Sequence, residues 1–326
     1  MLSRPVRRSV ARGCALLALA VAPLATAVGP ADAAPLATLD TTPATSIDVV
    51  ALVGTDRHLY VGLAGQDDYR DLGGASYEAP LLIAGEQSSW FLRIGRNSVP
   101  YVRSFERGWA RLAPDGVTCT KPSAAVDGDT LTVGCRGANG HLWTGRTTVV
   151  GDALPYLDRW VDRGGQVVHG GVAGVPRDGV FRYEVVGGDH VSYRKTTGQP
   201  GFAAVTGAPP CYGPLTQDDI SGGGRACAKR DGTLVVSAND PADANGLASV
   251  ALTAAGRPGL ARDEDGTTRY YALDGAGALW TAGQSATGVV SRPRTVAAPT
   301  AMYGVSAASL GASPEAAQAL GQQLYG

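Results

Sequence analysis

Two short runs of the chain place an imidazole two residues before an aromatic ring. They are His58–Tyr60 (HLY) and His141–Trp143 (HLW). In a β-strand, residues i and i+2 face the same side, so each histidine lies beside its aromatic while the leucine faces the other way. An aromatic face stacks on the C–H groups of a sugar, and a polar neighbour bonds its hydroxyls. These pairs are therefore candidate carbohydrate-binding platforms.

The same aromatic recurs along the chain after a short turn rich in glycine and asparagine. Clear copies are GTDRHLY, GRNSVPY, GANGHLW and DGAGALW, and weaker ones are GGDHVSY and ANGLAS (Ala244–Ser249). From Tyr60 to Trp280 the chain spans 220 residues over five intervals, which gives a mean period of 44. Short strands and turns that repeat every 40–50 residues or so are typical of propeller blades. The candidate sugar-contacting side chains are Tyr60, Tyr101, Trp143, Tyr193, Trp280, His58, His141, and the outer-strand residues Trp109 and Trp160.

A structural interpretation competes with the binding one. The aromatics could pack between blades while the histidines only decorate the turns. Repetition is expected under both interpretations and does not separate them.

The expected fold is all-β, a six-bladed β-propeller with four antiparallel strands in each blade. The third blade has expected strands at Ala124–Val126, Thr130–Cys135 and His141–Gly145, and Asp127-Gly128-Asp129 forms the turn between the first two of them. Asp-Gly between two alternating runs indicates a hairpin. A seven-bladed ring is the alternative, although residues 298–326 contain no copy of the turn with its aromatic.

The chain divides into four expected parts. Residues 1–33 have the basic start, apolar centre and small-residue end of a signal peptide, so a secreted, extracellular protein is expected. Residues 34–45 form a linker, residues 46–299 the propeller, and residues 300–326 a tail in which Ala316–Leu324 could form a short helix.

Four cysteines follow the expected signal peptide, an even number that favours disulfides in an oxidising compartment. Cys119 and Cys135 are 16 positions apart, as are Cys211 and Cys227, so nearest-neighbour pairing is the simplest of three connectivities. A metal site is the alternative, but the chain has no C-x-x-C pair and only four histidines. No metal and no cofactor are expected.

Composition and motifs narrow the classes of function. The net charge is −1, with no basic block in the expected mature chain, so nucleic acid is an improbable partner. No later segment is apolar and long enough for a membrane helix, so no membrane insertion is expected. Glycoside hydrolysis needs two carboxylates facing each other, and the glutamates are scattered singly as Glu78, Glu86, Glu106, Glu184 and Glu264. No catalytic residue is assigned.

The repeats resemble those of bacterial and fungal propeller lectins related to the Photorhabdus lectin, and more distantly tectonin-type repeats. The matching stretches are Ser123–Trp143 (SAAVDGDTLTVGCRGANGHLW), Thr267–Trp280 (TTRYYALDGAGALW) and Tyr69–Gly74 (YRDLGG). The resemblance implies binding of glycans, commonly fucose or methylated monosaccharides, in aromatic-lined pockets between adjacent blades. The leading hypothesis is thus a non-catalytic lectin. A glycoside hydrolase or lyase on a propeller, and a protein-binding scaffold, are the alternatives.

Overall fold

The computed structural model describes residues 47–84, 89–151, 153–173, 182–213, 216–217, 224–237, 247–263, 265–309, 322 and 324. All of these residues belong to one compact unit, Asp40–Gly326. The expected signal peptide (1–33) and linker (34–45) lie outside them, as does most of the expected helix at Ala316–Leu324, of which Gln322 and Leu324 are helical. A helix able to span a membrane is not found in the described part of the chain.

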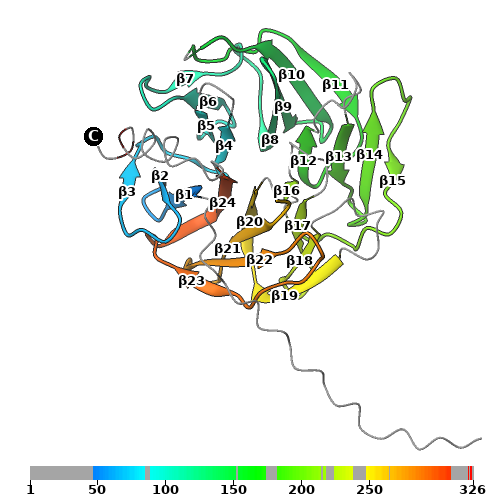
Figure 1. The fold of residues 1–326 in the computed structure, drawn as a ribbon. Coiled ribbons are helices and arrows are strands. Elements are labelled where there is room, and N and C mark those ends of the chain that lie inside the picture. The colour runs from blue at the N-terminus through cyan, green and yellow to red at the C-terminus, as the bar shows by residue number, and fades with distance from the viewer. Residues whose placement is uncertain are drawn as a thin grey trace, which may run out of the picture. The chain divides into compact units, whose positions relative to one another are not determined.

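The described strands form one eight-stranded sheet and four four-stranded sheets. The large sheet consists of two four-stranded halves, so the chain forms six successive sets, which we call repeats 1 to 6 in chain order (Figure 1). Repeat 1 is β24 (Ala301–Ser309), β1 (Asp48–Gly54), β2 (Leu59–Leu63) and β3 (Tyr69–Asp71); repeat 2 is β4 (Leu81–Ala84), β5 (Ser89–Ile94), β6 (Pro100–Arg103) and β7 (Ala110–Arg111); repeat 3 is β8 (Thr120–Asp127), β9 (Thr130–Arg136), β10 (Leu142–Thr148) and β11 (Trp160–Gly164). Repeat 4 is β12 (His169–Ala173), β13 (Arg182–Val186), β14 (Ser192–Thr196) and β15 (Ala203–Ala204); repeat 5 is β16 (Thr216–Gln217), β17 (Arg225–Ala228), β18 (Thr233–Ser237) and β19 (Leu247–Thr253); repeat 6 is β20 (Ala255–Arg262), β21 (Thr268–Leu273), β22 (Leu279–Gln284) and β23 (Arg294–Val296).

The first strands of the repeats line the centre of the unit. β4, β8, β12, β16, β20 and β24 contact one another in this order, and β24 contacts β4 in turn, so the repeats close into a ring (Figure 1). Buried apolar residues from adjacent repeats then pack face to face. For example, one cluster combines Leu81 and Leu92 of repeat 2 with Leu131 and Val133 of repeat 3.

Closure of the ring corrects the expected boundary at residue 299. Residues 300–326 were expected to form a tail, whereas Ala301–Ser309 forms β24 and pairs antiparallel with β1. The physical reason is burial: Ala301 and Val305 pack in a core cluster with Leu52 of β1. Because β24 supplies only the first strand of repeat 1, it carries no turn with an aromatic, and the repeat pattern could not reveal it.

Candidate functional site

A turn of one geometry joins the second and third strands of every repeat. The N–H of its first residue donates to the carbonyl of the fifth, over 2.8–3.0 Å, and the N–H of its fourth residue donates to the carbonyl of the first. The fourth residue has positive φ, whether it is a glycine or Arg57, Ser98 or His190. The first residues of the six turns are Gly54, Gly95, Gly137, Gly187, Lys229 and Asp274.

The predicted sugar-stacking aromatics fold back onto these turns. Trp143 lies so close to Gly137 that a Cβ there would stand 2.6 Å from the indole, and Tyr60 covers Gly54 in the same way. Four of these aromatic side chains also donate a hydrogen bond to a carboxylate or amide oxygen of the turn. These bonds are Tyr60–Asp56 (2.8 Å), Trp143–Asn139 (3.1 Å), Tyr193–Asp189 (2.6 Å) and Trp280–Asp274 (2.9 Å). The recurring glycine and aromatic thus form a clamp on the turn, a structural role that differs from the packing between blades considered above.

The turn of repeat 5 lies elsewhere than the sequence pattern placed it. The weak copy at Ala244–Ser249 falls partly outside the described residues, and its Ser249 lies on β19. The equivalent turn begins at Lys229, and Asp231 accepts a hydrogen bond from Thr233 N over 2.9 Å. Lys229 replaces the turn glycine and Val235 replaces the aromatic, so the pattern search had nothing to detect.

The two predicted histidines connect turns to outer strands. His58 Nδ1 lies 3.0 Å from Asp71 Oδ2, and this hydrogen bond raises the pKa of His58 above its ordinary value. His141 Nδ1 lies 2.9 Å from Asp162 Oδ2. Desolvation opposes ionisation of Asp162, but hydrogen bonds from His141 and from the N–H of Gly164 still leave the pKa of that carboxyl below its usual range. Both histidines therefore have structural partners.

The outer-strand tryptophans differ in their surroundings. Trp160 begins β11 and packs, half-buried, against the cluster that contains Leu157. Trp109 donates from Nε1 to the carbonyl of Leu72 over 3.1 Å, and the guanidinium of Arg93 lies over its ring at 4.7 Å. The same guanidinium lies 4.5 Å from the ring centroid of Tyr101. Of the predicted aromatics, Tyr101 lines a described cavity.

The segments that link consecutive repeats also share one geometry. In the first link, Ser76 N donates to Arg57 O in the turn of repeat 1, and Tyr77 N donates to Ile94 O in repeat 2, both over 2.9 Å. The residue at the Tyr77 position thus lies at the junction of two repeats. In order, the six junction residues are Tyr77, Thr120, Val168, Tyr212, Ala255 and Met302.

A cavity of about 240 Å³ opens between the first link and the turn of repeat 2. We call it cavity 1/2. The guanidinium of Arg57 lies 4.5 Å from the ring centroid of Tyr77, which lines the cavity. The lining residues are Ala75, Tyr77, Arg93, Gly95, Arg96, Asn97, Val99 and Tyr101.

A second cavity occupies the equivalent place between repeats 4 and 5. This cavity 4/5 measures about 420 Å³ and is lined by Pro209, Pro210, Tyr212, Lys229, Arg230 and Asp231. The ring of His190 stacks on Tyr212 with centroids 4.0 Å apart. Sequence analysis missed Tyr77 and Tyr212 because both lie in irregular links outside the strand pattern.

At these two junctions, three sequence positions carry a basic residue, a tyrosine and an arginine. The junction at cavity 1/2 combines Arg57, Tyr77 and Arg96, and the junction at cavity 4/5 combines His190, Tyr212 and Arg230. In each case these are the fourth residue of one turn, the junction residue and the second residue of the next turn. At the other four described junctions the same three positions are occupied by other residues: Ser98, Thr120 and Ala138; Gly140, Val168 and Gly188; Gly232, Ala255 and Gly275; and Gly277, Met302 and Thr55. This basic–tyrosine–arginine arrangement, in which Arg57 or His190 lies over the tyrosine and an arginine of the next turn lines the same cavity, occurs at two opposite junctions of the ring.

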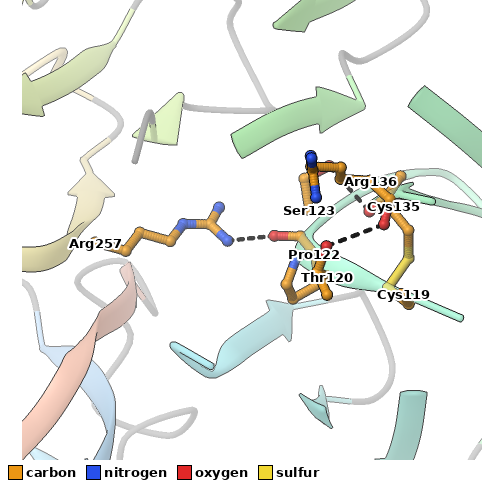
Figure 2. Close-up of a disulfide and its surroundings, with 8 residues drawn as sticks. Cys119, Thr120, Pro122, Ser123, Cys135, Arg136 and Arg257 are labelled. Carbon is orange, nitrogen blue, oxygen red and sulfur yellow. Dashed lines mark hydrogen bonds between the residues drawn. A yellow bond between two sulfur atoms is a disulfide. The ribbon is translucent and has the colours of Figure 1, made fainter. Parts of the chain in front are cut away.

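The cysteine prediction is confirmed in part. Cys119 and Cys135 form a disulfide (Figure 2), whereas Cys211 and Cys227 are free and buried in one cluster. Cys211 precedes a junction residue as Cys119 does, and Cys227 lies two residues before its turn as Cys135 does. Beside the disulfide, Arg257 of β20 donates to Pro122 O of β8 and so joins opposite repeats 6 and 3 (Figure 2).

Two of the five glutamates considered as candidate carboxylates have basic partners. Glu184 is buried against Arg225 and Arg194, and Glu78 pairs with Lys121. Glu86 and Glu264 lie outside the described residues. Neither cavity is lined by two carboxylates, and no group of three His, Cys, Asp or Glu in the described part of the chain could hold a metal ion.

No protein-family model matches the chain, and a comparison with curated proteins found no match. Among solved structures, TolB from Acinetobacter baumannii is similar with a TM-score of 0.55 and 12% identity, over 82% of this chain and 67% of that one. A fucose-specific lectin from Aleuria aurantia has a TM-score of 0.54 and 11% identity, over 79% and 97%. Another structure of the Aleuria aurantia lectin, described as a six-bladed β-propeller with a novel fucose recognition mode, gives 0.53 and 11% over the same shares. At such low identity, these likenesses show one property of the chain, a β-propeller fold.

Proposed function

We propose that the protein is a carbohydrate-binding, lectin-like β-propeller that binds glycans at the junctions between blades. In this proposal each repeat is one four-stranded blade, and six blades close the ring. The function requires no cofactor and no catalysis. The signal-like composition of residues 1–33 supports secretion, which would expose the protein to extracellular glycans.

One observation carries the proposal: the basic–tyrosine–arginine arrangement at the two junctions that have cavities. Sugar sites typically combine an aromatic face with a few fixed hydrogen-bond donors. Cavity 1/2 offers the rings of Tyr77 and Tyr101 together with the guanidinium groups of Arg93 and Arg96. Cavity 4/5 offers Tyr212 with Arg230.

The similarity to the Aleuria aurantia lectin is consistent with this proposal but does not carry it. That lectin is fucose-specific, and its similarity to this chain at 11% identity concerns the fold. In this proposal, four of the predicted aromatics hold the turns in shape and do not contact the sugar. They are Tyr60, Trp143, Tyr193 and Trp280. Two sites on opposite sides of one ring would gain avidity on a surface with dense glycans.

A glycan-array screen of residues 34–326 tests the proposal. Truncating both junction tyrosines, Tyr77→Ala with Tyr212→Ala, removes the aromatic face of each cavity. Loss of an anchor aromatic typically costs about 1–2 kcal/mol or more, so each site should weaken roughly tenfold.

A matched control is Val168→Ala, which truncates the same junction position between repeats 3 and 4, where the side chain is 38% exposed. This control should leave binding unchanged. Glycan binding that survives the double tyrosine substitution in a folded protein would refute the junction sites, and no binding by the unaltered protein would refute the function.

A further inference from the structure

Cavity 1/2 has a one-sided charge. Two of its lining residues, Arg93 and Arg96, are cationic, and none carries a carboxylate. The guanidinium of Arg57 adds a third positive charge, 4.5 Å from the centroid of the Tyr77 ring that lines the cavity. An uncharged ligand would leave the positive charge of these guanidinium groups uncompensated.

Arg93 is held in place before any ligand arrives. Its guanidinium lies over the rings of both Tyr101 and Trp109, at 4.5 and 4.7 Å, and Nη1 donates to Ala75 O over 2.5 Å. Nε is buried and has no hydrogen-bond partner among the described residues. Burial lowers the pKa of Arg93 from its ordinary value, but a guanidinium stays protonated in proteins. The cavity wall thus contains a cation that is held in place by the protein.

Two acidic residues of the surrounding segments form ion pairs with other residues. Glu78, next to Tyr77 in the chain, forms an ion pair with Lys121 at 3.0 Å. Asp71, on the last strand of repeat 1, bonds to His58 at 3.0 Å. They form these contacts away from the residues that line the cavity, so the charge of Arg93 and Arg96 is available to a ligand.

Cavity 4/5 provides an internal comparison. It carries Arg230 at the position of Arg96, but its lining also contains Asp231. Hydrogen bonds from Thr233 lower the pKa of Asp231, so its carboxylate is charged at neutral pH. Lys229 is engaged with Ser249 Oγ over 2.9 Å. The excess of positive charge is therefore smaller here.

We propose that cavity 1/2 binds a saccharide carrying an anionic substituent, a carboxylate or a sulfate, in preference to its neutral counterpart. The inference rests on the proposed function and specifies the class of sugar. The ring of the sugar would meet Tyr77 and Tyr101, and its anionic group would pair with Arg93 and Arg96. Arginine suits this role because its planar fork binds carboxylate and sulfate oxygens in pairs.

Calorimetric titration of the protein with matched ligands tests the inference. The pairs are methyl β-glucuronide against methyl β-glucoside, and glucose 6-sulfate against glucose, with inorganic sulfate alone as a third arm. We expect at least one acidic sugar to bind about tenfold or more tightly than its neutral partner, since hydrogen bonds to charged groups are the stronger ones. Its affinity should fall when NaCl is raised from 50 to 500 mM, because salt screens exposed charges.

Arg96→Gln is the diagnostic variant, because Arg96 is exposed and its replacement leaves the turn intact. It should remove most of the preference for the acidic sugar, while the matched variant Arg230→Gln in cavity 4/5 should not. Loss of the preference in Arg230→Gln instead, or equal affinity for acidic and neutral sugars, would overturn the inference and leave the proposed function standing. Binding of inorganic sulfate as tight as that of the sulfated sugar would also overturn it, by showing a simple anion site. Binding of neither sugar class would count against both proposals.

Discussion

Arg269 on β21 is the centre of a buried ion network that joins the two ends of the ring. It binds both carboxylate oxygens of Asp48 on β1, and its Nη1 and Nη2 bond to Asp263 over 2.5 and 2.6 Å. Tyr271 also donates to Asp48, and Ser309 on β24 donates to Asp263 over 2.9 Å. Repeats 6 and 1 therefore meet at this guanidinium.

Replacing Arg269 with methionine should strongly destabilise the protein. The Asp48 side chain is 2% exposed, so the substitution leaves a buried carboxylate with a single hydroxyl donor. Removing one partner of a buried pair costs about 3–5 kcal/mol. For a domain of this size, that loss corresponds to a fall of roughly 6–10 °C in Tm.

Urea unfolding followed by tryptophan fluorescence measures the effect. The exposed Arg294 on β23 gives a matched control, and Arg294→Met should change the free energy of unfolding by less than about 0.5 kcal/mol. Adding Asp48→Asn to Arg269→Met removes the more deeply buried of the two uncompensated charges, at Asp48 rather than Asp263, and should recover a large part of the loss. A loss below about 1 kcal/mol in Arg269→Met alone would refute the view that this network closes the ring.

Three further predictions follow from local geometry. Treatment with oxidised glutathione should join the free thiols of Cys211 and Cys227 in a disulfide and stabilise the protein by about 3 kcal/mol for a loop of this length. Thiol titration of the unfolded protein should then detect neither of these thiols, and two reactive thiols would contradict the prediction. Ser98→Gly should stabilise by up to about 1 kcal/mol in thermal unfolding, because φ is 57° there, whereas Ser98→Ala should bring no gain. The raised pKa of His58 means that its hydrogen bond to Asp71 stabilises fully below pH ~6.5 and is lost as pH rises through the folded-state pKa. Asp71→Asn should thus lower the free energy of unfolding at pH 5.5, by less than about 1 kcal/mol since both groups are half-exposed, and should change it little at pH 8.5. An equal loss of stability at the two pH values would argue against the ion pair.

Periodicity predicted much of the architecture because the turn that repeats is held by its own residues. Asp263–Gly266 was expected to precede a strand at Thr268–Leu273, and β21 has these bounds. Cys119 and Cys135 were paired from spacing alone, and their disulfide is present. These features depend on contacts within one repeat, which a local pattern records.

The candidate site was harder to predict because it depends on contacts between repeats. Tyr77 and Tyr212 belong to links with no strand alternation, and each is placed by backbone bonds to two different repeats. A signal was nevertheless present. The described links from Tyr77 to Ala255 place their junction residue 17 to 19 positions before the next turn, so aligning the chain on its turns would have brought the two tyrosines, at 18 and 17 positions, to within one position of each other.

The clamp and the cavities divide the positions of the turn between them. The first and third positions and the closing aromatic hold the backbone: in repeat 4, Gly187 lies under Tyr193, whose hydroxyl bonds to Asp189. The second and fourth positions make no clamp contact, so their side chains are free to vary. Arg96 takes the second position at cavity 1/2, and Arg57 takes the fourth despite a φ of 72°. A non-glycine residue in this region is strained by about 1 kcal/mol. Two of the three non-glycine residues at the fourth position, Arg57 and His190, lie at the junctions that have a cavity and a tyrosine, whereas Ser98 lies at the junction with Thr120. Strained backbone kept beside a cavity is more readily explained by a role in binding than by a role in folding, because a glycine there would fold at lower cost.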